Sequence, residues 1–148
     1  MFRRLLIVVG LMMLGATVVV AQSCPDTIST RQGLMKKSGA AGKTAVAMLK
    51  GQAPFDLAKA KEILVTFAND ASKMPTLFPD CSKTGDNSTA APAIWDKRAD
   101  FDASVAKFNA DVTAAQRNTK DLATFKAAFG TIAQDCASCH QRFRVKKS

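Results

Sequence analysis

The chain has 148 residues and carries 21 lysines and arginines against 12 aspartates and glutamates, which gives a formal net charge of +9. With 47% hydrophobic residues, eight glycines and five prolines, it is too apolar to be a disordered chain. It is also too poor in turn residues and β-branched residues for an ordinary β-sandwich or barrel. Its length suits one domain.

Residues 1–21 have the pattern of a cleaved export signal. Arg3 and Arg4 precede an apolar stretch that ends in the small residues Val19, Val20 and Ala21. The main alternative is a membrane anchor, because about 17 uncharged residues is close to the minimum for a span. A lipoprotein signal is a further alternative, but the residues before Cys24 do not include the leucine that is usual in such signals. Cleavage removes two arginines and no acid, which leaves +7 on residues 22–148. We therefore expect a periplasmic protein without a membrane segment, in a compartment where disulfides form.

Apolar periodicity predicts two helices in the first half of the mature chain. The first begins near Cys24-Pro25, continues to about Leu49 and stops at Gly51. The second begins around Asp56 and ends at Pro75. Their expected core stripes are Ile28, Met35, Gly42 and Leu49 in the first helix, and Leu57, Ala60, Leu64, Phe67, Ala71 and Met74 in the second.

A long loop without periodicity follows from Pro75 to Ala91, and two further helices follow the loop. The third begins at Pro92, and Asn118 or Thr119 is expected to cap the fourth. Their expected core stripes are Phe101, Val105, Phe108, Val112 and Ala115, then Leu122, Phe125, Phe129, Ile132, Cys136, Cys139 and Phe143.

Four amphipathic helices with short first and third connections and a long middle connection predict an all-α fold. The expected architecture of residues 22–148 is an antiparallel up-down-up-down four-helix bundle. A mature chain of about 127 residues is long enough to bury one core but not two. Nearly all of the stripe residues are expected to pack in that core.

One stretch of the fourth helix has a chemical signature, Cys136-Ala137-Ser138-Cys139-His140. C-x-x-C-H is the pattern of covalent c-type haem attachment. Two thiols three residues apart lie on one helix face, where each can form a thioether with a haem vinyl group. The imidazole of His140 can then bind the iron. We therefore predict haem c near the C-terminus, held against the inside of the bundle.

Three alternatives to haem fit this pattern less well. A thioredoxin-like dithiol is typical of a βαβ setting with the motif at the start of a helix. A zinc site needs about four ligands, and the chain has no second pair of Cys or His residues at suitable spacing. A structural disulfide within the motif would leave the only histidine of the chain, His140, unexplained.

The single histidine limits the iron chemistry. Bis-histidine ligation within one chain is excluded, so the sixth position holds methionine, a weak ligand or nothing. The methionines of the mature chain are Met35, Met48 and Met74. Met35 is the best candidate, because it lies midway along the first helix, whereas Met74 lies beside Pro75 at a helix end.

These residues resemble the class II cytochromes c, that is, cytochrome c′ and its low-spin, methionine-ligated relatives. The resemblance covers essentially the whole mature chain. It rests on C-x-x-C-H at the end of the last helix followed by Phe143, Arg144 and a basic tail, on Arg31-Gln32-Gly33-Leu34-Met35-Lys36, on Leu77-Phe78-Pro79 with Gly85-Asp86, and on Pro92-Ala93-Ile94-Trp95. It implies a periplasmic four-helix bundle, often a homodimer, with one haem c for electron transfer or for binding a small gas.

The resemblance also implies roles for individual residues. Cys136 and Cys139 are the thioether positions, His140 is the proximal ligand and Met35 is the distal residue. It places further polar residues near the haem or its propionates, namely Arg31, Gln32, Asp86 and Arg144. For Met35 both outcomes occur in the family: low-spin members use a methionine there as a ligand, whereas high-spin members leave the iron open. For Arg31, Gln32 and Asp86 the alternative is an ordinary solvated surface residue.

Cys24 and Cys81 depart from the common pattern of this family. A disulfide between them would close a 57-residue loop and stabilise the fold by about 4 kcal/mol on the chain-entropy estimate. Two free thiols or an intermolecular bridge are the alternatives.

The leading functional hypothesis is an electron carrier with iron ligated by His140 and Met35. A second is a five-coordinate cytochrome c′ that binds nitric oxide or carbon monoxide, and a third is a helical dithiol protein without haem. An enzyme is not expected, because we find neither a distal histidine nor a nucleophile and base pair. The expected partner is a redox protein, reached by electrostatic steering. Nucleic acid is not expected, since the aromatic residues follow the core stripes.

Overall fold

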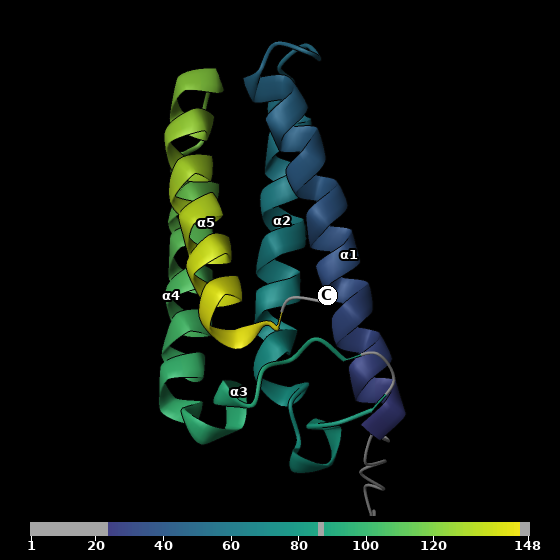
Figure 1. Ribbon diagram of the computed structural model, residues 1–148. Coiled ribbons are helices and arrows are strands. Elements are labelled where there is room, and N and C mark those ends of the chain that lie inside the picture. Colours follow the sequence, from purple (N-terminus) through teal and green to yellow (C-terminus); the bar gives the residue numbers. More distant parts are fainter. Residues whose placement is uncertain (1–23, 86–87, 146–148) are drawn as a thin grey trace, which may run out of the picture.

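The computed structural model describes residues 24–85 and 88–145 (Figure 1). The expected signal peptide, residues 1–21, and Asp86 lie outside these ranges. The described elements are α1 (Cys24–Leu49), α2 (Leu57–Lys73), the 3₁₀ turns η1 (Met74–Thr76) and η2 (Asp80–Ser82), α3 (Ala93–Asp96), α4 (Arg98–Asn118) and α5 (Leu122–Phe143).

The four long helices α1, α2, α4 and α5 form the predicted antiparallel bundle. In Figure 1 the pair α1 and α2 lies beside the pair α4 and α5, and the chain from α2 to α4 crosses the lower end. Consecutive long helices pack closely, whereas α1 and α5 have little contact. The bundle is therefore most open between α1 and α5. No helix of the described ranges combines the length and apolarity that crossing a bilayer requires.

A glycine ends the first helix and an aspartate begins the second, as the sequence predicts. Gly51 has a φ of 68°, and Gln52 N–H donates to the Ala47 carbonyl at 2.9 Å, which closes the C-terminal turn of α1. Asp56 caps α2, because its carboxylate accepts from Lys59 N–H at 3.0 Å. The connection between α1 and α2 is therefore short and specified locally.

The segment between α2 and α4 is more ordered than predicted. The expected loop contains η1 and η2, and the expected third helix is broken at Lys97 (φ −127°, ψ 51°) into α3 and α4. Contacts distant in sequence explain the break: Trp95 Nε1 donates to the Phe78 carbonyl at 3.1 Å, and Arg98 Nη2 donates to the Pro75 carbonyl at 2.8 Å. Both bonds hold the start of this helical segment against the loop.

The predicted cap of the last helix is wrong. Asn118 is the last residue of α4, and Thr119 follows it in extended conformation. Asp121 caps α5 instead: its carboxylate accepts from Thr124 N–H at 2.8 Å, and the Thr124 hydroxyl accepts from Asp121 N–H at 3.1 Å. Leu122, which follows this capping box, is 42% exposed and does not belong to the core, contrary to expectation.

The core consists of two clusters rather than one. The first is formed by α1, α2, α4 and α5 near the turns that join α1 to α2 and α4 to α5. The second lies around the α2–α4 connection and the end of α5. Their buried members are Ala45, Met48, Ala60, Ile63, Leu64, Phe67, Val112, Ala115, Phe125 and Ile132 in the first, and Met74, Leu77, Phe78, Ile94, Phe101, Val105 and Phe143 in the second.

The disulfide between Cys24 and Cys81 is present, with the Cα atoms 5.9 Å apart. It joins the first residue of α1 to η2, so the predicted pairing is confirmed and the alternatives of free thiols or an intermolecular bridge are wrong. The bond ties η2, within the α2–α4 connection, to the start of α1.

Candidate functional site: a cavity between α1 and α5

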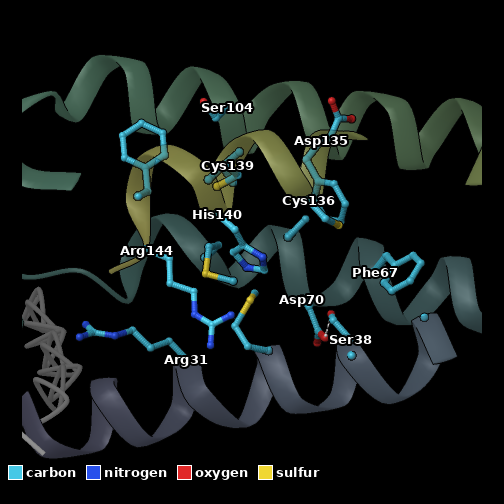
Figure 2. Close-up of a pocket in the computed structure, with 18 of the residues that line it drawn as sticks. Arg31, Ser38, Phe67, Asp70, Ser104, Asp135, Cys136, Cys139, His140 and Arg144 are labelled. Atoms are coloured by element: carbon cyan, nitrogen blue, oxygen red, sulfur yellow. Dashed lines mark hydrogen bonds between the residues drawn. The ribbon is translucent and has the colours of Figure 1, made fainter. Parts of the chain in front are cut away.

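A cavity of about 1100 Å³ lies between the two core clusters and is bordered by α1 and α5 (Figure 2). This volume is slightly above the usual range of roughly 300–1,000 Å³ for small-molecule sites. The cavity brings together every predicted site residue that the structure describes: Arg31, Gln32, Met35, Cys136, Cys139, His140 and Arg144. Asp86 lies outside the described residues.

The α5 wall presents Cys136, Cys139 and His140 to the cavity. Both cysteines are half-buried free thiols, so the motif does not form an internal disulfide. Their spacing of three residues on one helix turn places them on the same face, as predicted. Within the described ranges, no three or more Cys, His, Asp or Glu side chains form a group that could hold a metal ion, so the zinc alternative lacks a ligand set.

The environment of the motif favours neutral side chains. Burial raises the pKa of the Cys136 and Cys139 thiols, and the nearby Asp135 carboxylate acts in the same direction. Burial also lowers the pKa of His140, and the positive charge of Arg144 lowers it further. A neutral imidazole has a free nitrogen lone pair and can bind a metal.

Backbone pairing fixes the end of α5 beside the cavity. Ala91 N–H donates to the Phe143 carbonyl at 3.0 Å, and Val145 N–H donates to the Thr89 carbonyl at 2.9 Å. Arg144 lies between these bonds, in an isolated antiparallel bridge with Ala90, and lines the cavity. The residue that follows the helix is therefore held by the α2–α4 connection.

The α1 wall presents Met35 and two glycines. Met35 is 41% exposed and lines the cavity, whereas Ile28 of the same predicted stripe is buried at 2%. Met35 is therefore not a core residue, and its thioether is available to whatever occupies the cavity. Gly39 and Gly42 line the same wall, and a Cβ atom at either position would meet no atom within 4 Å. The α1 backbone thus borders open space in this part of the cavity.

Arg31 is buried, at 5% exposure, and is held by the α2–α4 connection. Its Nη1 donates to the Leu77 carbonyl at 3.1 Å and to Ser82 Oγ at 2.8 Å, while its Nη2 donates to the Ser82 carbonyl at 3.0 Å and to Ser88 Oγ at 2.7 Å. The guanidinium also lies 4.8 Å from the centre of the Phe78 ring. Burial lowers the pKa of Arg31, and no carboxylate of the described residues pairs with it. The surface alternative for Arg31 is therefore wrong.

We expect Arg31→Met to destabilise the holoprotein by about 3 kcal/mol, because four acceptors lose their donor in a buried setting. The thermal midpoint, followed by circular dichroism, should fall by roughly 10 °C. Lys37→Met on the exposed side of α1 is the matched control and should leave the midpoint unchanged. An equal midpoint for both variants would contradict this structural role of Arg31.

Several polar residues of the cavity were not predicted from the sequence, among them Ser38 and Asp70. Ser38 on α1 donates from its Oγ to Asp70 Oδ2 on α2 at 2.7 Å, and both residues line the cavity. The apolar stripe of α2 does indicate the position of Asp70. Asp70 lies three residues after Phe67 and four before Met74, which places it on the core face of the helix. Ser38 had no comparable signal.

The donor set and the shape of this cavity fit a covalently attached haem. Two thiols and an imidazole lie on one wall, a thioether lies on the α1 wall, and apolar side chains from both core clusters contribute much of the remaining lining. Arg31 and Arg144 lie towards one end of the cavity, to one side of His140 in Figure 2. Positive side chains in that position suit the carboxylates of a porphyrin.

Comparison with known proteins agrees with this interpretation. Residues 26–144 match the family described as cytochrome C′. The chain belongs to the cytochrome c′ family. It is 45% identical over 145 residues to cytochrome c′ of Rhodopseudomonas palustris, with 98% of each chain covered. It is 36% identical over 148 residues to cytochrome c-556 of Agrobacterium fabrum, with 99% of this chain and 100% of the relative covered.

Solved structures of the cytochrome c′ family share the fold. A structure of cytochrome c′ from Rhodopseudomonas palustris superposes with a TM-score of 0.81 at 46% identity, over 86% of this chain and 100% of that chain. Cytochrome c556 from the same organism gives a TM-score of 0.75 at 34% identity, over 84% and 99%. The cofactor is therefore haem c with its iron, and the chain is a c-type haem electron carrier in the broad sense of this family.

Proposed function

We propose that this protein is a periplasmic one-electron carrier in which His140 and Met35 both bind the haem iron. The observation that carries the proposal is that Met35 on α1 and His140 on α5 line the same cavity. Haem c supplies reversible one-electron exchange between ferric and ferrous iron. The protein supplies the attachment, the ligands and the exclusion of water.

Each residue of the α5 wall has a part in this proposal. The Cys136 and Cys139 thiols would hold the haem through thioether bonds, in which each S–H adds across one vinyl group. His140 offers its neutral imidazole, which burial and Arg144 favour. Arg144, Gln32 and Arg31 line the cavity, where they would face the haem or its propionates, and the α2–α4 connection holds Arg31 in place. Asp86 belongs to the same proposed set.

Met35 decides between the electron carrier and a gas-binding protein. Its thioether is a soft ligand that favours ferrous iron and raises the potential. Two features support ligation: the side chain lines the cavity, and no core residue encloses it fully. A six-coordinate iron needs little rearrangement on electron transfer, which suits a carrier.

Met35→Leu tests this assignment, because leucine keeps the apolar volume and removes the sulfur. We expect the ferric methionine-to-iron absorption band to disappear and carbon monoxide to bind readily to the ferrous protein. Met74→Leu is the matched control, since Met74 also lines the cavity and should leave the band unchanged. A wild-type protein without that band, with spectra unaffected by Met35→Leu, would exclude ligation by Met35.

A five-coordinate protein that binds nitric oxide or carbon monoxide is the second candidate. It is favoured by the 45% identity to a cytochrome c′, which is higher than the 36% identity to the cytochrome c-556 of Agrobacterium fabrum. In that case Met35 and Phe78 would restrict access to the iron. The Met35→Leu spectra distinguish the two candidates.

The remaining parts of the proposal concern location and partners. Cleavage after Ala21 would release the chain into the periplasm, where its net charge of +7 favours an acidic redox protein as partner. We propose no enzymatic reaction and no nucleic-acid partner. A homodimer of the kind implied by the family is part of the same proposal.

A further inference from the structure

Asp70 is a buried carboxylate that the proposed attachment and ligation do not use. It lies on α2, is 2% exposed and lines the cavity. Its Oδ2 accepts the bond from Ser38 Oγ at 2.7 Å, whereas its Oδ1 has no hydrogen-bond partner among the described residues. Figure 2 shows the Ser38 and Asp70 side chains directed towards one another, on the other side of His140 from Arg31 and Arg144.

The charge of Asp70 is not neutralised within the described part of the chain. Among the described residues one other acid lines the cavity, Asp135, and its Oδ1 accepts from Lys107 Nζ at 2.5 Å. None of the ion pairs between described residues includes Asp70. Arg31, the buried cation of the cavity, donates to the α2–α4 connection instead. Asp70 is therefore the one lining carboxylate without a cationic partner in the described ranges.

A buried carboxylate with an unused oxygen is costly unless a positive charge lies nearby. Lys36, Lys43 and Arg144 also line the cavity, but none of them forms an ion pair with Asp70 among the described residues. The haem would bring a further positive charge into the cavity, and that charge is one unit larger in the ferric state than in the ferrous state. We propose that the Asp70 carboxylate is a built-in counter-charge that stabilises the ferric state and lowers the reduction potential. The proposal rests on the proposed haem site and goes beyond it.

Ser38 acts as a positioning residue in this arrangement. It lies three residues after Met35, on the adjacent turn of α1, and both residues line the cavity. Its bond to Asp70 joins that turn to α2 and orients the carboxylate so that Oδ1 is free. Ser38→Ala removes the hydroxyl and keeps the carboxylate of Asp70, whereas Asp70→Asn removes the negative charge and keeps the Ser38 hydroxyl. The two contributions can therefore be separated by mutation.

The test is the midpoint potential of the holoprotein at neutral pH, measured by optical redox titration. Asp70→Asn is nearly isosteric and can still accept from Ser38. With an effective dielectric constant of about 20, a unit charge across such a cavity changes the ferrous-to-ferric ratio at fixed potential by about tenfold. We expect a rise of that size, equivalent to about 59 mV for one electron. Asp100→Asn, at an exposed position on α4, is the matched control and should leave the potential unchanged.

Two further variants separate charge from packing. Asp70→Ser removes the charge with a smaller side chain and should raise the potential as Asp70→Asn does, whereas Asp70→Glu keeps the charge and should not. Ser38→Ala should shift the potential less than Asp70→Asn. The proposal is overturned if Asp70→Asn or Asp70→Ser leaves the potential unchanged, or if Asp70→Glu or Ser38→Ala raises it equally.

Failure of the proposed function has a different signature. It would be visible in the wild-type protein, as an absent haem spectrum or as a ferric spectrum without methionine ligation. The Asp70 prediction requires only a haem in the cavity. The potential measurement therefore tests it in both cases, with a six-coordinate or with a five-coordinate iron. The ferric spectrum of each variant is recorded alongside the potential. A potential change accompanied by a changed ligand spectrum in Asp70→Asn counts against the counter-charge.

Discussion

Replacing Cys136 and Cys139 together by serine is expected to remove all covalently bound haem from the protein. Serine keeps the size and polarity of the side chain but cannot form a thioether with a haem vinyl group. After denaturing electrophoresis, haem staining of the double variant should be absent, and acidic organic solvent should extract any remaining haem. The apolar cavity of about 1100 Å³ would then lack its covalent occupant, so the holo-fold should be lost as well.

Ser138→Ala provides the matched control for this loss. Ser138 lies between the two cysteines, and its hydroxyl donates to the Asp135 carbonyl at 3.1 Å within α5. This variant should keep the haem stain and the wild-type spectrum. Covalent haem in the double serine variant would contradict attachment at this motif, whatever the remaining properties of the protein.

Removal of the disulfide by the double variant Cys24→Ser and Cys81→Ser is expected to lower the free energy of unfolding by about 4 kcal/mol. The bond closes 57 residues, and its loss increases the entropy of the unfolded chain. The thermal midpoint of the holoprotein should fall by roughly 10 °C or more. It should fall further if the α2–α4 connection then loosens its hold on Arg31.

A thiol reductant supplies the control for the disulfide. The reduced wild-type protein should approach the midpoint of the double serine variant, and the variant itself should not respond to the reductant. A variant with the wild-type midpoint would show that the native contacts of η2 hold the connection without the bond.

The sequence predicted the long helices well because their apolar positions recur at helical spacing over many turns. The stripe of α2 is largely buried as expected, with Ala60, Leu64 and Phe67 all at 3% exposure or less. The same regularity predicted Phe125 and Ile132 of α5, both at 1% or less. Such long amphipathic segments determine the bundle before any individual contact is considered.

The ends of the elements were harder to predict, because several residues there suit the same role. Asn118, Thr119 and Asp121 are all favourable cap residues, and only the reciprocal bonds with Thr124 select Asp121. The break at Lys97 depends on contacts made by Trp95 and Arg98 to residues about 20 positions earlier. Local sequence contains no sign of those contacts.

Only part of the site could be predicted, because local patterns indicate some of its residues and not others. The C-x-x-C-H motif is a local pattern, so its position on the cavity wall followed from the stripe of α5. Arg31 could be expected near the cavity only through the family resemblance, although its spacing from Ile28 already placed it on the buried face of α1. Asp70 was missed, since an acid on a core stripe is easily taken for an interruption of the stripe.

The disulfide gives the molecule a simple covalent topology. Residues 24–81 form a closed ring that contains α1, α2 and Met35, whereas α3, α4 and α5, with His140, belong to an open arm that leaves the ring at Ser82. In the proposed ligation, one ligand comes from the ring and the other from the arm. The iron would then be a second cross-link of the molecule, and its two bonds would join the two halves across the side where α1 and α5 pack least.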